Sequence, residues 1–310
     1  MAVLPLAEAE QQYFDSLGIE PFERFVDLAN VGARVRVLEI GTGSPVVFVH
    51  GGMVAGASWA GLAASLPDHR CILLDRPGCG GSDMPAGAFA TIEEKERVAD
   101  ELLADLLDGL DLPSASVVST SLGGWYSFRS AAAHPDRIDR IVAMGFQVGA
   151  SIQAAPLIMR VPAPRWIPRF RPPVGRRMAR SMLRQSGMKS AIDSGKFNEM
   201  MLTWMVSLLR TTDTMPNEMT TAPRPIGLRG PNAATMHSPE LLARVTAPTH
   251  LFWGDDDLFG GETVAREFAA ALPDASVEMV PGAGHAPWID APVAAADAVR
   301  RHLAGPSPSH

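Results

Sequence analysis

A repeated alternation of short apolar runs with helical segments is the feature that most constrains what this chain can fold into. Runs typical of strands lie at 21–28, 33–40, 45–50, 71–75, 116–120, 141–145, 249–254 and 276–282. Helical patterns occur at about 92–110, directly after 121 and at about 291–303. Because repeated strand and helix units form parallel sheets, we predict an α/β fold with a mostly parallel central sheet and helices on both faces.

The segment 147–240 interrupts this alternation. It contains Pro-rich turns such as VPAPRWIPRFRPP and helical runs such as KFNEMMLTWMVSLL. Ten of the 15 methionines lie in it, and the stretch 151–238 has 13 Lys and Arg against four Asp and Glu, in a chain with a net charge of −7. We therefore predict a core formed by 1–146 and 241–310, and an inserted helical lid over 147–240.

Composition and charge argue against several classes of protein. A net charge of −7 gives the chain no basic footprint for nucleic acid. The start, MAVLPLAEAEQQYF, lacks the basic and apolar regions of a signal peptide, and no apolar run approaches the ~18 residues of a membrane span. Two cysteines, Cys71 and Cys79, form neither a disulfide framework nor a metal-ligand set. We expect a soluble cytoplasmic protein with reduced thiols, no metal and no membrane partner, and the sequence leaves its oligomeric state open.

Ser121 is the first candidate for chemistry. It stands in STSLGG, after the apolar run SVVST and before a helical segment that ends near Pro135. On such a strand-to-helix turn a nucleophile is forced out of the sheet edge, and crowding of the backbone requires small residues two positions before and after it. These positions are Ser119 and Gly123, so Ser119 replaces the first glycine of the usual GxSxG pattern. The motif alone is about as typical of a structural turn as of a catalytic serine.

A serine nucleophile needs a base, and the base needs an orienting carboxylate. His285 occurs in VPGAGHAPWIDAP, after a strand and before the final helix, where its imidazole can lie over the sheet edge. Its alternative role is to cap that helix. The carboxylate should follow the strand THLFWG, where Asp255, Asp256 and Asp257 stand in succession. Three adjacent acids cannot all face one imidazole, so these residues alone leave the choice open.

The expected oxyanion donors are two backbone N–H groups. A helix that begins at Leu122 directs its N–H groups and dipole toward the place where charge develops on an attacked carbonyl. The second donor should come from His50-Gly51-Gly52, where glycines allow close approach, and we choose Gly52. We interpret His50 as structural. Three residues beside these motifs are candidates for lining the substrate pocket: Met53, Trp125 and Trp288.

Five motifs, in order, resemble those of the α/β-hydrolase family. They are HGG at 50–52, DRPGCGGSD at 75–83, STSLGG at 119–124, WGDDD at 253–257 and GAGHAPW at 282–288. The order Ser, Asp, His also matches the family. Because the family's acid commonly stands three residues after the glycine of WGxxD, the resemblance implies a triad of Ser121, His285 and Asp257, with Asp256 as the fallback. It is weak over the lid. The 75–83 segment lacks the GK[ST] ending of a P-loop, and we interpret it as a structural turn.

These residues predict a cofactor-independent serine hydrolase that cleaves a carboxylic ester of a small molecule through an acyl-enzyme. Serine at the nucleophile position argues against haloalkane dehalogenases and epoxide hydrolases, which need aspartate there. Related enzymes use the same triad to cleave C–C bonds, open lactones or make peracids, and a non-catalytic ligand-binding protein can share the fold. These alternatives stay open.

The predicted lid carries two features that bear on the substrate. Its many methionines favour an adaptable apolar pocket. Its arginines either attract a free carboxylate on the substrate, or they form a solvated face or pair with the acidic core. The arginines concerned are at positions 160, 165, 169, 171, 176, 177, 180 and 184.

Overall fold

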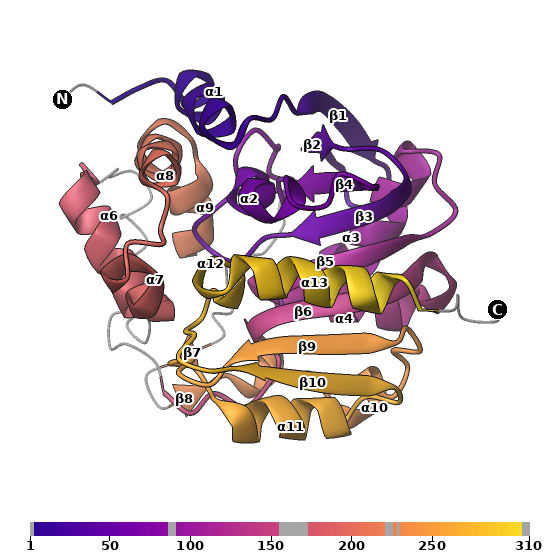
Figure 1. Ribbon diagram of the computed structural model, residues 1–310. Coiled ribbons are helices and arrows are strands. Elements are labelled where there is room, and N and C mark those ends of the chain that lie inside the picture. The colour runs from indigo at the N-terminus through magenta and orange to yellow at the C-terminus, as the bar shows by residue number, and fades with distance from the viewer. Residues whose placement is uncertain (1–2, 86–90, 155–172, 221–225, 228–229, 306–310) are drawn as a thin grey trace.

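An eight-stranded sheet forms the centre of the protein in the computed structural model, which describes residues 3–85, 91–154, 173–220, 226–227 and 230–305 (Figure 1). The strand order is β1-β2-β4-β3-β5-β6-β9-β10. The β1–β2 and β2–β4 pairs are antiparallel, and the other pairs are parallel. The bounds are Phe22–Leu28 (β1), Ala33–Ile40 (β2), Ser44–Val49 (β3), His69–Leu74 (β4), Ala115–Ser121 (β5), Ile138–Gln147 (β6), Thr249–Gly254 (β9) and Ala275–Val280 (β10). The predicted α/β class and mostly parallel sheet are confirmed.

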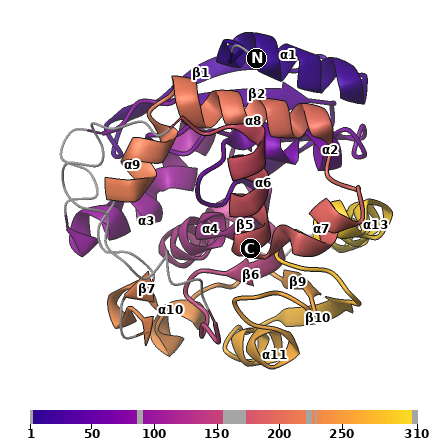
Figure 2. The ribbon, with the colours of Figure 1, turned by 90° about the vertical axis from the view of Figure 1, so that its left-hand side faces the viewer.

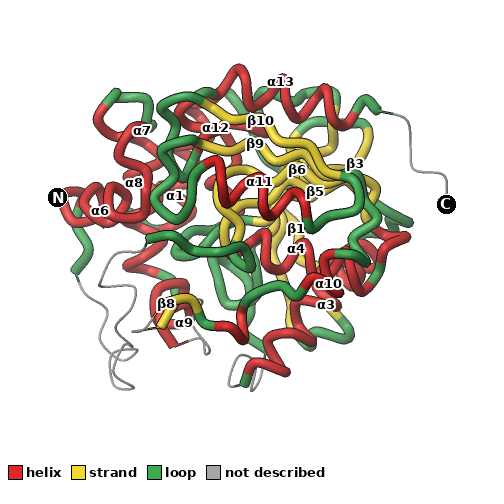
Figure 3. Tube along the Cα trace, turned by 90° about the horizontal axis from the view of Figure 1, so that it is seen from below, coloured by secondary structure: helices red, strands yellow, loops and turns green. Residues whose placement is uncertain are grey.

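Helices lie on both faces of this sheet, as Figure 3 shows from below. Those of the core are α1 (Leu6–Leu17), α2 (Ala60–Ala63), α3 (Ile92–Gly109), α4 (Leu122–Ala133), α10 (Pro239–Leu242), α11 (Glu262–Ala270), α12 (Pro287–Asp290) and α13 (Pro292–Leu303). Alternate residues of β3 divide between two apolar layers. Val46 and Phe48 pack with α1, α2 and α13, whereas Val47 and Val49 pack with α3, α4 and α11. A strand buried on both faces explains the continuous apolar run in the sequence.

Between β6 and α10 along the chain, the described residues form four further helices. They are α6 (Arg176–Leu183), α7 (Lys189–Asp193), α8 (Glu199–Thr211) and α9 (Thr214–Thr220), called here the inserted helices. A π-helical turn, Arg184–Met188, joins α6 to α7, and a two-stranded ribbon, Ile226–Gly227 (β7) with Gly230–Pro231 (β8), follows α9. Figure 2 views the inserted helices from the front, gathered at one end of the strands. Within the described residues, no helix combines the length and apolar character needed to cross a membrane.

Helix α1 is absent from the sequence-based prediction. Its Glu10 accepts a hydrogen bond from the Trp204 Nε1–H of α8 at 3.1 Å and pairs with Arg36 of β2 at 2.6 Å. The rings of Tyr13 and Trp204 stack with their centroids 6.2 Å apart. Helix α1 therefore connects the inserted helix α8 to the core, and its formation depends on contacts with residues almost 200 positions away.

Lys95 of α3 is almost fully buried, with its ammonium 5.1 Å from the centroid of the Trp125 ring. Burial lowers the pKa of Lys95 from 10.5 to about 8. The unfolded chain therefore binds more protons than the folded one between these values, so stability rises with pH there. Lys95→Met should remove this gain. Urea unfolding should show that, from about pH 7.5 to about pH 9.5, the free energy of unfolding of the wild type rises by ~2 kcal/mol more than that of the variant. The same pH dependence of the free energy of unfolding in both proteins would contradict the burial of a charged Lys95.

Candidate active site

Ser121 lies at the junction of β5 and α4. Its φ of 51° and ψ of −122° belong to a region that non-glycine residues rarely adopt. A Cβ at Gly123 would lie 2.2 Å from the carbonyl oxygen of Val49, so this position requires glycine. Ser119, in contrast, fits in a buried position where its hydroxyl has no hydrogen-bond partner among the described residues. The sharp strand-to-helix turn expected from STSLGG is present, and serine is tolerated where the usual pattern has its first glycine.

Asp257 and His285 form a buried pair. The His285 Nδ1 lies 3.0 Å from Oδ2 and 3.3 Å from Oδ1 of Asp257. Backbone N–H groups of Phe146 and Phe259 donate to the two Asp257 oxygens at 2.9 and 3.1 Å. With two fixed donors, the carboxylate is oriented and its remaining lone pairs face the imidazole.

The other two acids of the Asp255-Asp256-Asp257 run face elsewhere. Asp255 accepts the Gly282 N–H at 2.7 Å and holds the loop that precedes His285, whereas Asp256 is exposed. The structure therefore places on the imidazole the residue that the WGxxD resemblance implied. The fallback, Asp256, does not contact it.

The end of β6 contacts all three predicted triad residues. Gly145, with φ of 67°, allows the His285 carbonyl to approach so closely that a Cβ there would lie 2.5 Å from its oxygen. The Phe146 N–H binds Asp257, and the Val148 N–H donates to the Ser121 carbonyl at 3.0 Å. The Ser121 hydroxyl makes no hydrogen bond with any described residue, and such contacts commonly tighten only when substrate binds.

The predicted oxyanion loop follows β3 and lies beside Ser121. A Cβ at Gly51 would lie 3.3 Å from the Ser121 Cβ, so these two backbones are neighbours. Gly52 is exposed, and Met53 is half-buried with a φ of 61°. Leu122 opens α4 directly after Ser121. Backbone strain at both Met53 and Ser121 is typical of sites where local geometry serves function.

Arg76 forms hydrogen bonds with this loop that fix its backbone. Its Nε donates to the His50 carbonyl at 2.9 Å and its Nη2 to the Gly51 carbonyl at 2.8 Å, while its backbone N–H donates to His50 Nε2 at 3.0 Å. His50 Nδ1 lies 2.7 Å from the Gly51 carbonyl. Burial, together with Arg76, holds the pKa of His50 well below its ordinary value, so the ring is neutral with its proton on Nδ1. Arg76 is a positioning residue of the DRPGCGGSD segment that sequence reasoning missed.

The three candidate pocket residues lie in different surroundings. Trp125 is 1% exposed, and its ring contacts Lys95, Arg129 and His237 in the layer between α3 and α4. Trp288 packs on Trp59 with ring centroids 4.4 Å apart. Met53 belongs to the oxyanion loop, and both tryptophan rings have contacts within the core.

Of the arginines predicted for the lid, four lie in the described residues, and three of them pair with acids of the same segment, whereas Arg177 is exposed. Arg176 and Arg180 both bind Glu199, and Arg184 binds Asp193, on half-exposed surfaces. This agrees with the solvated-face alternative for these residues, although their partners belong to the inserted helices and not to the acidic core. The arginines at 160, 165, 169 and 171 lie outside the described residues.

Gly187 connects the inserted helices to the His285 loop. Its carbonyl accepts the His285 N–H at 2.9 Å, and a Cβ on it would lie 2.8 Å from the His285 Cβ. Nearby, Ser190 Oγ donates to Asp290 Oδ2 at 2.9 Å, and Lys196 Nζ donates to the Asp290 carbonyl at 2.5 Å. The kink at Gly187, with φ of 85°, brings the inserted helices into contact with the backbone of His285. No local sequence signal reveals this contact.

Gly187→Ala should therefore displace His285. Both the positive φ and the close contact oppose a methyl group, and an imidazole moved by even ~1 Å can cost about 10²-fold in rate. Gly195→Ala is the matched control, because Gly195 also has a positive φ, of 72°, but nothing lies within 4 Å of its Cβ position. We expect kcat on a simple ester to fall at least ~10-fold further in Gly187→Ala than in Gly195→Ala. Equal losses would mean that the Gly187 contact does not position the imidazole.

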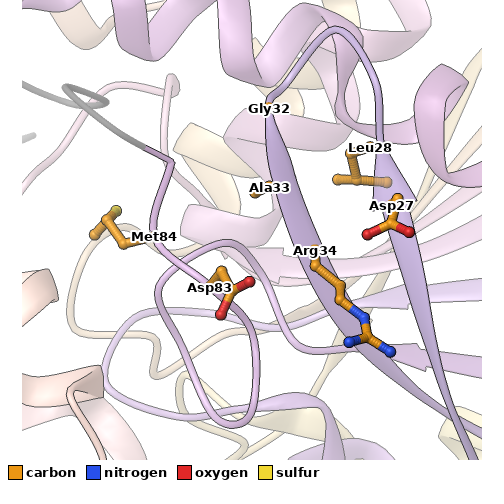
Figure 4. Close-up of a pocket in the computed structure, with 7 residues that line it drawn as sticks. All are labelled: Asp27, Leu28, Gly32, Ala33, Arg34, Asp83 and Met84. Carbon is orange, nitrogen blue, oxygen red and sulfur yellow. The ribbon is translucent and has the colours of Figure 1, made fainter.

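A separate hollow lies at the far end of the β1–β2 hairpin (Figure 4). It shares no residue with the triad or the oxyanion loop. The residues that line it are Asp27, Leu28, Gly32, Ala33, Arg34, Asp83 and Met84. Within the described part of the chain, no group of three or more His, Cys, Asp or Glu is arranged to hold a metal ion.

Comparison with known proteins agrees with this geometry. The sequence model of the Alpha/beta hydrolase family matches residues 46–298, which is most of the chain. The chain belongs to this family. The resemblance to this family is thereby confirmed, and the matched range spans positions 121, 257 and 285.

Several proteins similar to this alpha/beta hydrolase are named as hydrolases or carboxylesterases. A 2-hydroxy-6-oxononadienedioate/2-hydroxy-6-oxononatrienedioate hydrolase of Cupriavidus pinatubonensis is 25% identical over 271 residues, 82% of this chain and 86% of that protein. Among solved structures, carboxylesterase CesB of Bacillus subtilis superposes with a TM-score of 0.75 at 20% identity, covering 97% of this chain and 98% of that one. A 2-hydroxy-6-oxo-6-phenylhexa-2,4-dienoate hydrolase from Rhodococcus sp. strain RHA1 superposes with a TM-score of 0.73 at 19% identity, covering 93% and 100%. These superpositions support the fold.

Proposed function

We propose that this chain is a cofactor-independent serine hydrolase that cleaves a carboxylic ester of a small molecule. The observation that carries the proposal is the buried Asp257–His285 pair, with Oδ2 and Nδ1 3.0 Å apart. It lies at the same carboxyl ends of the strands where Ser121 stands in a strained turn. A serine hydroxyl is activated by a neighbouring base whose orientation is fixed by a third group. The family's many hydrolase relatives support the same reaction class.

In the proposed reaction, Ser121 Oγ attacks the ester carbonyl carbon while His285 Nε2 takes its proton. Asp257 holds the Nδ1–H and stabilises the imidazolium that forms. The negative oxygen of the tetrahedral intermediate accepts hydrogen bonds from the Gly52 and Leu122 N–H groups. The alkoxide leaves with the proton from His285, and a water molecule activated by the same ring then releases the acid from Ser121.

We propose the division into a core of 1–146 and 241–310 and a lid of 147–240 as the basis of substrate selection. The inserted helices reach the His285 loop through Gly187, so the lid borders the reacting groups. Partly buried methionines, which adapt to varied apolar shapes, pack against the apolar cluster that contains residues of both the inserted helices and the core. They are Met53, Met182, Met188, Met200 and Met219. An apolar acyl or alcohol group is therefore the favoured substrate.

Cleavage of a C–C bond is the second candidate, because the Cupriavidus relative and the Rhodococcus structure are named as hydrolases of 2-hydroxy-6-oxo dienoic compounds. Lactone opening and peracid formation use the same groups. Turnover should be measured on p-nitrophenyl butyrate, a small lactone and a ring-fission dienoate. We expect the ester to be cleaved with the highest kcat/KM. Ester turnover far below that of the dienoate would assign the site to C–C cleavage. If none of the three compounds is turned over, a ligand-binding protein is favoured.

A free carboxylate on the substrate has little support from the described arginines, since Arg176, Arg180 and Arg184 are already paired and Arg177 is exposed on the same helix as two of them. We therefore expect a half-ester of a dicarboxylic acid and its neutral analogue to be cleaved with similar kcat/KM at low salt. A strong preference for the charged half-ester, lost at high salt, would show that another cation reaches the site.

A further inference from the structure

Glu218 of α9 extends from the inserted helices to the oxyanion loop. Its Oε2 lies 3.2 Å from the position that a Cβ on Gly52 would occupy. Its Oε1 accepts hydrogen bonds from Arg76 Nη2 at 2.8 Å and Cys79 Sγ at 3.4 Å. The side chain is 12% exposed, and no described residue donates a hydrogen bond to Oε2. One carboxylate oxygen is thus fixed by the core, while the other faces the open glycine that we propose as an oxyanion donor.

The charges around Glu218 determine which ligand suits this oxygen. Arg76 is bonded to the carboxylate, and Lys95 interacts with it electrostatically, so two cations face one anion. Burial raises the pKa of the Cys79 thiol well above its ordinary value, which keeps it a hydrogen-bond donor. A substrate ammonium would add a third positive charge to this buried cluster. A neutral donor, such as a hydroxyl or an amide N–H, adds none.

We propose that Glu218 Oε2 accepts a hydrogen bond from a neutral donor that the substrate carries close to its scissile carbonyl. Glu218 is then a specificity-determining residue, an inference that rests on the proposed ester hydrolysis at Ser121. A bound substrate displaces water from Oε2. If it brings a hydroxyl, the carboxylate keeps a partner, whereas an alkyl group or a carbonyl oxygen leaves a charged oxygen unsatisfied. Discrimination of this kind is strong, because the penalty falls on the analogue that lacks the donor.

The geometry makes Glu218→Gln a sharp test. Arg76 and Cys79 donate to the fixed oxygen, and arginine cannot accept, so the amide oxygen of glutamine must take that place. The amide NH₂ then faces Gly52, and the subsite changes from an acceptor to a donor. We therefore expect the preference to invert, with an oxo group favoured over a hydroxyl.

The experiment compares kcat/KM for matched esters that differ at one position. On the acyl side these are phenyl 3-hydroxybutyrate and phenyl 3-oxobutyrate, and on the alcohol side 2-hydroxypropyl butyrate and 2-oxopropyl butyrate. In at least one pair, the hydroxyl-to-oxo ratio should fall by about 10²-fold from the wild type to Glu218→Gln. Glu199→Gln is the matched control, because Glu199 is an exposed glutamate of α8 that pairs with Arg176 and Arg180. This variant should leave both ratios unchanged.

Glu218→Asp is a second variant that keeps the charge but withdraws it from Gly52, and it should reduce the ratio without inverting it. Partial unfolding of either variant lowers both rates of a pair and leaves the ratio intact. Ratios in both pairs that are the same in wild type and Glu218→Gln would overturn the inference. Failure of the proposed function looks different, because the wild type would then cleave none of these esters, or Ser121→Ala would cleave them all.

Discussion

Ser121→Ala is expected to reduce kcat on p-nitrophenyl butyrate by about 10⁴-fold or more. The alanine removes the atom that attacks the ester and leaves only the oxyanion donors and substrate binding, which in triad enzymes retain a small part of the rate. KM should change far less than kcat, because the hydroxyl acts on the reacting atoms in the transition state. The measurement is steady-state release of p-nitrophenolate by both proteins.

Ser119→Ala is the control for this variant. Ser119 lies two residues away on the same strand and is fully buried, and no residue that the structure describes forms a hydrogen bond with its hydroxyl. Its removal should therefore leave kcat within a few fold of the wild type. Equal loss in both variants would show that the effect of Ser121→Ala is structural, and full activity in Ser121→Ala would remove Ser121 from the reaction.

Asp257→Asn should lower kcat by about 10⁴-fold. The Asp257 oxygens accept hydrogen bonds from two backbone N–H groups and from the imidazole, so every contact requires an acceptor. Asparagine supplies one oxygen and one NH₂ group. Because each Asp257 oxygen accepts one backbone N–H, the NH₂ group must face one of these donors, and that hydrogen bond is lost. Where the NH₂ also faces Nδ1, the proton of His285 moves to Nε2, the nitrogen that has to receive the serine proton.

Asp256→Asn separates this role from a general effect of the acidic run. Asp256 is the adjacent residue, is exposed, and stands outside the pair that binds His285. Its variant should keep kcat within a few fold of the wild type. A large loss of kcat in Asp256→Asn with little loss in Asp257→Asn would assign the orienting role to Asp256 and contradict the hydrogen bond between Asp257 and His285.

The core of the fold could be predicted because its signals are local. The β9 strand coincides with the apolar run THLFWG, and α3 begins one residue after Thr91, whose hydroxyl accepts the Glu94 N–H at 3.3 Å in a capping box. The glycine at 123 follows from crowding around a strained turn. For the choice among three adjacent acids, local pattern was insufficient and the family resemblance was needed.

The parts that escaped prediction depend on contacts between distant segments. Arg76 acts through the carbonyls of a loop about 25 residues earlier, and Glu218 meets Arg76 across 142 positions. Gly187 contacts His285 through a kinked turn in an insertion with no periodic signal. The candidate role of Trp125 rested on its nearness to Ser121 in sequence. Its ring lies instead against Lys95 of α3 and Arg129 of α4, partners that nearness in sequence does not reveal.

Covalent labelling with a fluorophosphonate tests most directly whether Ser121 is the activated nucleophile. The reagent phosphonylates a serine whose proton is taken by a neighbouring base, and intact-protein and peptide mass spectrometry locate the adduct. We expect one adduct per chain, on the peptide that contains Ser121, with labelling retained in Ser119→Ala and strongly slowed in His285→Ala. An unlabelled wild-type protein that still hydrolyses esters, or an adduct on another residue, would contradict the account.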